Sequence, residues 1–268
     1  LLDVVYTCQS RQAWYRDEAL VNGEPPLHFV GSLNLATPPA EAADHLRQQL
    51  GFSVQARRDC PTWTEALRLF ISQAEQAGVM VMVSGVVMNN NNRQLDPQEF
   101  RGFALADPLA PLVFINGADS KAAQMFTLAH ELAHLWLGQS ALSDVQAAEA
   151  PVHAVETWCN QVAAELLVPQ AEFRAALQAD EPLEVALQRL ARHFKVSTLV
   201  LLRRMLDVGW LDRAAFWRAY RDEEARLQTL AARNAGGGDF YRTTVSRVSR
   251  RFAQTLVAST LEGRTLYR

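Results

Sequence analysis

The stretch Ser120-Lys-Ala-Ala-Gln-Met-Phe-Thr-Leu-Ala-His-Glu-Leu-Ala-His-Leu-Trp-Leu137 decides the fold of this 268-residue chain. Its apolar residues recur at helical spacing, which predicts one helix with a stripe of side chains facing the core. Asp119 or Ser120 can cap its first turn, and Gly138 can end it. We therefore expect a single helix that packs into the protein interior.

Within this helix, His130 and His134 are four residues apart, so their imidazoles lie on the same face. Two neutral imidazoles at this spacing can bind one metal ion, with Glu131 beside the place of a metal-bound water. A chain of this length matches the three specified positions by accident on the order of once in a hundred cases. The alternative is a pair of hydrogen-bonded core histidines with a solvated glutamate between them. The surrounding sequence must decide between the two interpretations.

The run from Val155 to Pro169 predicts a second helix that ends at the proline. Glu156, Asn160, Ala163 and Ala164 share one of its faces, and the two small alanines allow a close approach to the first helix. Glu156 is therefore the best candidate for a third metal ligand, although alone it would be taken for a surface acid. Asn160, one turn later, can hold an imidazole N–H and orient the ring.

Other donors compete for the role of third ligand; the rivals are Asp144, Glu149, His153 and Glu165. Glu165 lies off the face that carries Glu156. His153 precedes Glu156 by three residues, so it can instead line the cleft and contact an oxyanion. Cys159 is the softest donor nearby, but a thiolate suits a structural zinc site better than a hydrolytic one.

Two motifs give the chain a family resemblance. The first is Phe-Thr-Leu-Ala-His-Glu-Leu-Ala-His at 126–134, and the second is Glu-Thr-Trp-Cys-Asn-Gln-Val-Ala-Ala-Glu-Leu-Leu-Val-Pro at 156–169. Together they resemble the ImmA/IrrE family of zinc metallopeptidases, specifically between about residues 77 and 169. By position, the resemblance implies that His130, His134 and Glu156 bind one Zn²⁺ ion, with Mn²⁺ as the alternative. It also implies that Glu131 is the catalytic general base.

The resemblance implies an α+β fold, with a small mixed or antiparallel sheet flanked by helices as a zincin-like catalytic lobe and a helical, helix-turn-helix-like C-terminal region. Members of this family cleave repressors of the helix-turn-helix class in mobile-element induction or stress responses. We therefore expect a zinc endopeptidase that acts in transcription regulation on such a repressor or a similar regulator. Many members also carry an N-terminal DNA-binding domain. This sequence begins at Leu1 without an initiator Met and shows no such domain, so we expect a trimmed or processed fragment.

The implied ligand set predicts the chemistry of the site. Two neutral histidines and one carboxylate leave a net positive charge on zinc, which lowers the pKa of a bound water and polarises a carbonyl. Glu131 would take the proton of the attacking water and pass it to the leaving amine. The candidates for stabilising the oxyanion are His153, Tyr241 and an arginine of the C-terminal segment, and the sequence selects none of them.

Composition and charge narrow the class of protein. The chain has 26 Lys and Arg against 29 Asp and Glu, and this net charge of −3 does not indicate nucleic-acid binding by the whole surface. Its three cysteines are far apart and odd in number, which is typical of a reducing cytosol. It has neither an apolar run long enough to cross a bilayer nor a signal-peptide pattern. We expect a cytoplasmic protein without a membrane partner.

We divide the chain into an N-terminal helical region (1–60), a zinc metallopeptidase domain (61–170), a helical, helix-turn-helix-like region (171–235) and a C-terminal helix (239–268). Helices are predicted over 1–22, 40–50 and 62–77, and strands over 79–84, 101–106 and 111–116, the last two joined as a hairpin. Four asparagines at 89–92 predict a surface loop. In the zinc peptidases that the chain resembles, a substrate adds as a strand to the sheet edge beside the helix with the metal ligands. We expect that edge at residues 103–106 or in the neighbouring segment.

Residues 187–206 resemble a helix-turn-helix unit, with a turn at Lys195-Val196 and a second helix capped by Ser197. Arg203 and Arg204 would then meet DNA phosphates. We favour the interpretation that this unit does not bind DNA and only packs on the catalytic lobe, because its second helix is mostly apolar. DNA binding is also weakly indicated by the C-terminal arginines 242, 247, 250 and 251, which equally suit a solvated face or an acidic partner. The alternative function is a DNA-binding transcriptional regulator or antitoxin-like module with a peptidase-derived lobe.

Overall fold

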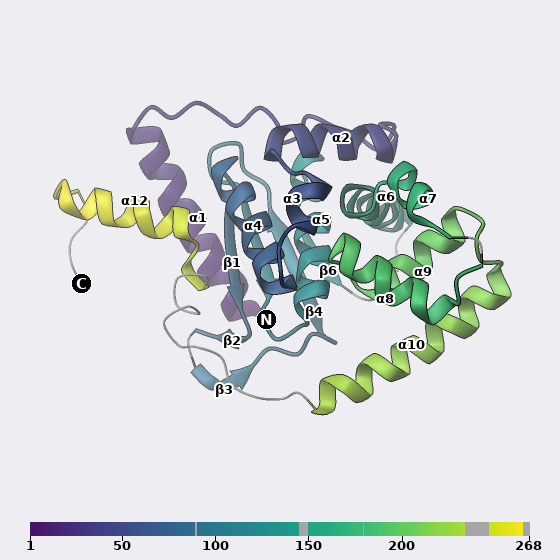
Figure 1. Cartoon of the computed structure of the whole chain (residues 1–268). Coiled ribbons are helices and arrows are strands. Elements are labelled where there is room, and N and C mark those ends of the chain that lie inside the picture. The colour runs from purple at the N-terminus through teal and green to yellow at the C-terminus, as the bar shows by residue number, and fades with distance from the viewer. Residues whose placement is uncertain (89, 145–149, 179, 234–246, 265–268) are drawn as a thin grey trace.

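A computed structural model describes residues 1–88, 90–144, 150–178, 180–233 and 247–264 (Figure 1). At its centre lies a mixed four-stranded sheet in the order β1-β5-β4-β6. β1 (Met80–Ser84) runs parallel to β5 (Leu112–Asn116), whereas β4 (Phe100–Leu105) is antiparallel to both β5 and β6 (Ala141–Asp144). The predicted α+β class and the predicted hairpin, which is formed by β4 and β5, are confirmed.

The strand order decides between the two segments expected at the sheet edge, residues 103–106 and their neighbour. The first is wrong, because β4 pairs with β5 on one side and with β6 on the other. Phe103 lies opposite Leu142, so β6 forms this edge of the sheet. β6 is short and has no alternating apolar pattern, which is why its pairing is not evident from the sequence.

A second, two-stranded antiparallel sheet is formed by β2 (Val86–Val87) and β3 (Asn90–Gln94). The surface loop predicted over 89–92 is therefore wrong for its last three residues; residue 89 lies outside the described part. Every residue of β3 is exposed, as the polar sequence indicates. Its strand conformation comes from pairing with β2 rather than from burial of an apolar face.

Helices cover both faces of the main sheet. The first five helices, of which the last carries His130 and His134, are α1 (Leu2–Val21), α2 (Pro39–Leu50), α3 (Val54–Arg58), α4 (Trp63–Gln76) and α5 (Lys121–Trp136). The later ones are α6 (Ala150–Leu167), α7 (Gln170–Ala176), α8 (Leu183–Phe194), α9 (Thr198–Asp207), α10 (Arg213–Arg233) and α12 (Arg250–Leu261). The helices predicted over 1–22, 40–50, 62–77 and 120–137 are confirmed. Among the described residues, no helix is both long and apolar enough to cross a bilayer.

The two faces of the sheet belong to two hydrophobic cores. Successive side chains of a strand point to opposite faces. Val81 and Val83 accordingly join the larger core with α4 and α5, whereas Met80 and Met82 join the smaller core with α1 and Phe252 of α12. Because both faces are covered, every residue of β1 is buried, and its sequence is apolar from Met80 to Val83.

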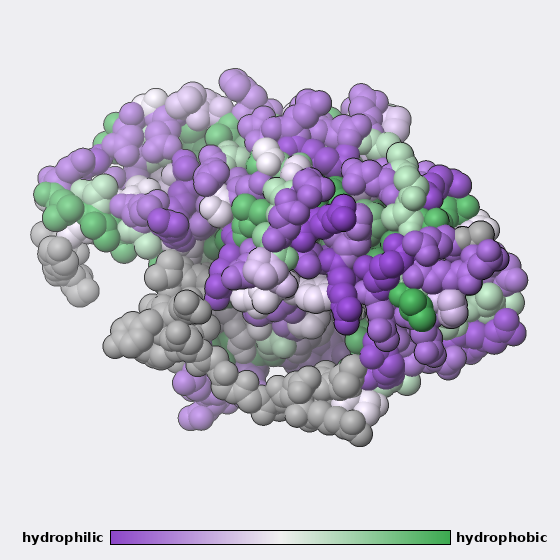
Figure 2. Space-filling view, in the orientation of Figure 1, coloured by the Kyte–Doolittle hydropathy of each residue, from purple (hydrophilic) through white to green (hydrophobic). Residues whose placement is uncertain are grey.

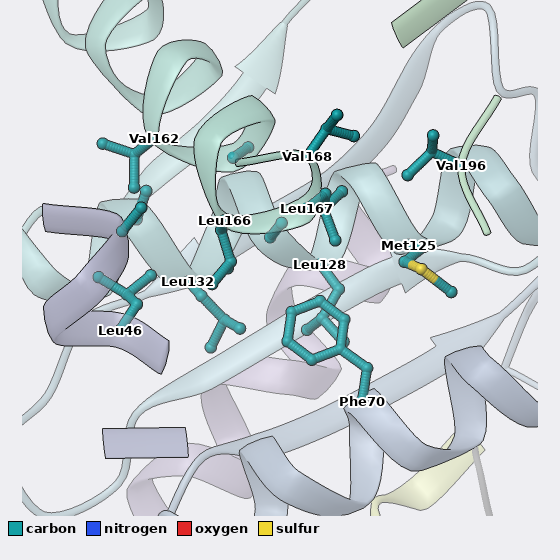
Figure 3. Close-up of a cluster of buried hydrophobic side chains, with 14 of the residues drawn as sticks. Leu46, Phe70, Met125, Leu128, Leu132, Val162, Leu166, Leu167, Val168 and Val196 are labelled. Carbon is teal, nitrogen blue, oxygen red and sulfur yellow. The ribbon is translucent and has the colours of Figure 1, made fainter. Parts of the chain in front are cut away.

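The larger core holds α5 and α6 against each other. Leu128 and Leu132 of α5 pack among Leu46 of α2, Phe70 of α4 and Leu166 of α6 (Figure 3). All five side chains are fully buried, and burial of each leucine stabilises the fold by roughly 1.5–3 kcal/mol. This apolar contact sets the two helices side by side, so that the polar residues of α5 and α6 can meet.

The expected helix-turn-helix arrangement is present in α8 and α9. α8 ends at Lys195, whose φ of +52° is left-handed, and α9 begins after Ser197, whose Oγ accepts a hydrogen bond from Val200 N. A left-handed residue at this position ends a helix by satisfying its last carbonyls. The turn and the cap therefore lie where the sequence places them.

The two arginines of α9 have different surroundings. Arg204 is buried, and its Nη2 lies 2.5 Å from Glu165 Oε2, which agrees with the favoured interpretation of a unit that packs on the catalytic lobe. Arg203 is exposed and its Nε lies 3.3 Å from Asp207 Oδ1. The unit thus directs at least one of its two candidate DNA-binding arginines into the protein.

The C-terminal helix α12 packs on α1 and β1. Glu75 of α4 caps its start, because Glu75 Oε1 accepts hydrogen bonds from Ser249 Oγ (2.6 Å) and Arg250 N (2.8 Å). On its outer side Val257 and Leu261 are exposed, and apolar patches mark this end of a mostly hydrophilic face (Figure 2). Residues 240–246, which we expected at the start of this helix, lie outside the described part.

Candidate metal centre

The first half of the site is built on α5. Ser120 caps the helix, because its Oγ accepts a hydrogen bond from Ala123 N at 3.2 Å. His130 and His134, ten and fourteen residues further on, face α6. Both side chains are buried, and that of His134 completely. Buried imidazoles require partners for their ring nitrogens, since an unpaired buried polar group destabilises the fold.

The second half comes from α6, which brings Glu156 between the two histidines. Glu156 Oε2 lies 3.1 Å from His130 Nε2, and Glu156 Oε1 lies 3.3 Å from His134 Nε2. The two Nε2 atoms are 3.1 Å apart. Among the residues that the structure describes, these three form the group whose ligand atoms all lie within 4.8 Å of one another.

This arrangement fits a tetrahedral zinc ion. With zinc–nitrogen distances of about 2.0–2.1 Å, neighbouring ligand atoms of a tetrahedral site lie about 3.3 Å apart. The three separations in the site have this size. Two imidazole lone pairs that face each other at this distance repel unless a cation or a proton lies between them. The residues present therefore suit a divalent cation bound by two nitrogens and one carboxylate.

Asn160 sets the orientation of one ligand. Its Oδ1 lies 3.1 Å from His130 Nδ1 and, as an amide oxygen, accepts the N–H of that nitrogen. The proton is thereby kept on Nδ1, and the Nε2 lone pair points at the site. This is the contact that the sequence predicts for Asn160.

The acid–base properties of the site follow from burial and from these contacts. Burial favours the neutral form of His130, but the hydrogen bond to Glu156 and the charges of Glu131 and Glu156 outweigh it and raise the pKa of His130. Burial also opposes ionisation of Glu156, yet the hydrogen bonds from both histidines lower the pKa of Glu156 to about 2. Burial and the two glutamates raise the pKa of the Cys159 thiol, which therefore stays protonated and is a poor competitor as ligand.

Glu131 is fully buried beside β4, at a place where the strand has no side chain. A Cβ built on Gly102 would lie 2.5 Å from Thr127 Cγ2, 2.7 Å from the carbonyl oxygen of Phe114 and 3.3 Å from Glu131 Oε1. Sequence reasoning did not single out Gly102. The sequence does contain a signal for Gly102, because a glycine inside a predicted strand indicates that another group approaches the backbone closely.

Comparison with known proteins agrees with this geometry. Residues 74–206 match the model of a peptidase family described as the IrrE N-terminal-like domain. Over 96 residues the chain is 38% identical to the radiation response metalloprotease IrrE of Deinococcus radiodurans. Residues 74–206 belong to the ImmA/IrrE family. The aligned part covers 34% of this chain and 29% of IrrE, and residues 248–268 separately match a family described as a domain of unknown function.

His130, His134 and Glu156, the ligands expected from the two motifs, lie together, and the remaining residues considered for the site have other positions. His153 is exposed on α6, one turn before Glu156, and its cleft or oxyanion role stays a prediction. Tyr241, the second residue considered for that role, and Glu149, a rival ligand, lie outside the described residues. Glu165 is not near the site's donor group but is paired with Arg204.

Proposed function

We propose that this chain is a zinc-dependent endopeptidase. The observation that supports the proposal is the convergence of His130, His134 and Glu156 at tetrahedral spacing, with the buried carboxylate of Glu131 next in sequence to the first ligand. The 38% identity to a protein named as a metalloprotease supports it independently.

Each residue has a defined task in this proposal. A zinc ion held by His130, His134 and Glu156 would activate a water molecule and polarise the scissile carbonyl. The Glu131 carboxylate accepts a proton from that water and donates it to the leaving amine. Asn160 holds the His130 ring in the tautomer that binds metal. Manganese is the alternative ion, because it accepts the same nitrogen and oxygen donors.

We propose a helix-turn-helix repressor, or a similar regulator, as the substrate. The family resemblance supports this choice. We place the protein in the cytoplasm, because Cys8, Cys60 and Cys159 are all free, as expected where thiols stay reduced.

A second candidate function is a DNA-binding regulator or antitoxin-like module in which the peptidase-derived lobe binds a partner without turnover. The helix-turn-helix arrangement of α8 and α9 favours it. Burial of Arg204 and the presence of a base beside the ligands favour the peptidase.

The test is incubation of the zinc-loaded protein with helix-turn-helix repressors encoded beside its gene. We expect cleavage by the wild type, and a loss of at least about a hundredfold in Glu131→Gln, which keeps the ligands and the zinc but lacks the base. Glu41→Gln, an exposed carboxylate at the start of α2, serves as the matched control and should cleave normally. Undiminished cleavage by Glu131→Gln contradicts the assigned base. Sequence-specific DNA binding without any cleavage would favour the second function.

A further inference from the structure

Three arginines from three different helices converge on the last turns of α6, the helix that supplies the third ligand. Arg47 of α2 donates from Nη2 to the Glu165 carbonyl oxygen at 2.5 Å, and Arg57 of α3 donates to the Leu167 carbonyl oxygen. Arg204 of α9 donates from Nη2 to the Glu165 side chain at 2.5 Å. Cations at this end complement the negative pole of the helix.

The pair formed by Arg204 and Glu165 differs from the other two contacts. Its partners are both charged and both largely buried, with side-chain exposures of 7% and 15%. The second oxygen of Glu165 accepts the backbone N–H of Gln170 at 3.0 Å, so the carboxylate is held on both sides. A charge-assisted, buried contact of this kind has a strict geometry, unlike the apolar packing beside it.

The apolar contact between α5 and α6 does not by itself fix how far one helix slides along the other. Val162, Ala163 and Leu166 face the core, and apolar burial, unlike a hydrogen bond, does not depend on direction. A zinc site tolerates much less, because ligand distances must stay within about 0.2 Å. Glu156 and Glu165 lie on the same helix, about 13 Å apart at 1.5 Å per residue. A displacement of one end of this rigid segment therefore moves the ligand at the other.

We propose that Arg204 and Glu165 are a positioning pair that fixes the end of α6 against α9, so that the helix-turn-helix-like unit sets the position of Glu156 and with it the zinc affinity of the site. This inference rests on the proposed function. It also gives a task to two residues that the sequence suggested for other roles, Glu165 as a rival ligand and Arg204 as a DNA contact.

The experiment measures zinc affinity by competition with a chromophoric chelator, together with the free energy of unfolding of the zinc-free protein. The variants are Arg204→Met, Glu165→Gln and the double variant. The matched control is Arg203→Met, which removes the neighbouring arginine of the same helix, whose exposed partner is Asp207. Binding of zinc by the wild type tests the proposed function first, and the variants then test the positioning role.

We expect each single variant to bind zinc about tenfold more weakly, the low end of what loss of an outer partner of a metal ligand causes. Each also loses stability, because one buried charge is left without its partner. In the double variant no unpaired charge is left, so stability returns toward that of the wild type while zinc binding stays about tenfold weaker. The control should match the wild type.

A spectroscopic measurement distinguishes positioning from general destabilisation. The Nδ1–H proton of His130 reports its hydrogen bond to Asn160, which also joins α5 to α6. Its resonance should shift or broaden by exchange in the double variant. The inference is overturned if zinc affinity recovers together with stability in the double variant, or if affinity and the His130 signal are unchanged in folded single variants.

Discussion

At the scale of single residues, the site is a set of donor atoms whose protonation is controlled by their neighbours. Asn160 keeps the proton of His130 on Nδ1, and the two histidines keep Glu156 ionised. The three ligand atoms thus present lone pairs to one point. The Glu156 carboxylate also stabilises the protonated form of His130, so protons compete with metal at this site.

This competition predicts a pH dependence of zinc affinity. Because the pKa of His130 is raised, a proton occupies it up to a higher pH than in an ordinary histidine, and affinity falls as the pH falls through that value. Glu156 contributes nothing to the change in this range, since its pKa is about 2. Chelator competition between about pH 5.5 and about pH 8 checks this. An affinity that is constant or that rises toward acid would contradict it.

Gly102 has no room for a side chain, and we predict that Gly102→Ala damages both stability and the site. The new methyl group would meet Thr127 at 2.5 Å and the Phe114 carbonyl at 2.7 Å, which should lower the free energy of unfolding by about 1–3 kcal/mol. Urea unfolding measures this, and Thr127→Ala in the same chain should restore only part, because the carbonyl contact stays. A Gly102→Ala protein as stable as the wild type would show that the strand does not approach α5 this closely.

At the scale of elements, helices with a clear period and explicit caps could be predicted from the sequence. α5 and its Ser120 cap are examples, because these signals lie within one segment. The pairing of β6 with β4 could not be predicted, since it depends on a partner about 40 residues away and on no local pattern. The partner of Arg204 could not be predicted for the same reason, because Glu165 lies on another helix.

The Ser120 cap of α5 contributes measurably to the stability of the protein. We predict that Ser120→Ala lowers the free energy of unfolding by about 1 kcal/mol, because the N–H of Ala123 loses its acceptor. His130 and His134 lie two to four turns away, so zinc affinity of the folded protein should change little. Urea unfolding and chelator competition on the same preparation separate the two quantities. A large loss of zinc affinity here would mean that the first turn of α5 also determines ligand geometry.

At the scale of the whole molecule, the central sheet separates two cores, and the metal site lies on the side of the larger one. α5 and α6 are held together by apolar packing and by the polar contacts of the site, whereas the other end of α6 is held by Arg204 of α9. The convergence of His130, His134 and Glu156 could be predicted because two motifs carry these residues. Gly102 and the arginines around α6 could not, because their importance comes from the packing of distant segments.

The measurement that tests the central claim most directly is the zinc content of the purified protein, determined by mass spectrometry of the metal after dialysis. For the wild type we predict one zinc ion per chain, and for Glu156→Ala a loss of most of it, because two histidines alone bind zinc weakly. His153→Ala, which removes the exposed histidine one turn away, should keep the full content. Wild-type zinc content in Glu156→Ala, or its loss in His153→Ala, would contradict the ligand set on which the whole account depends.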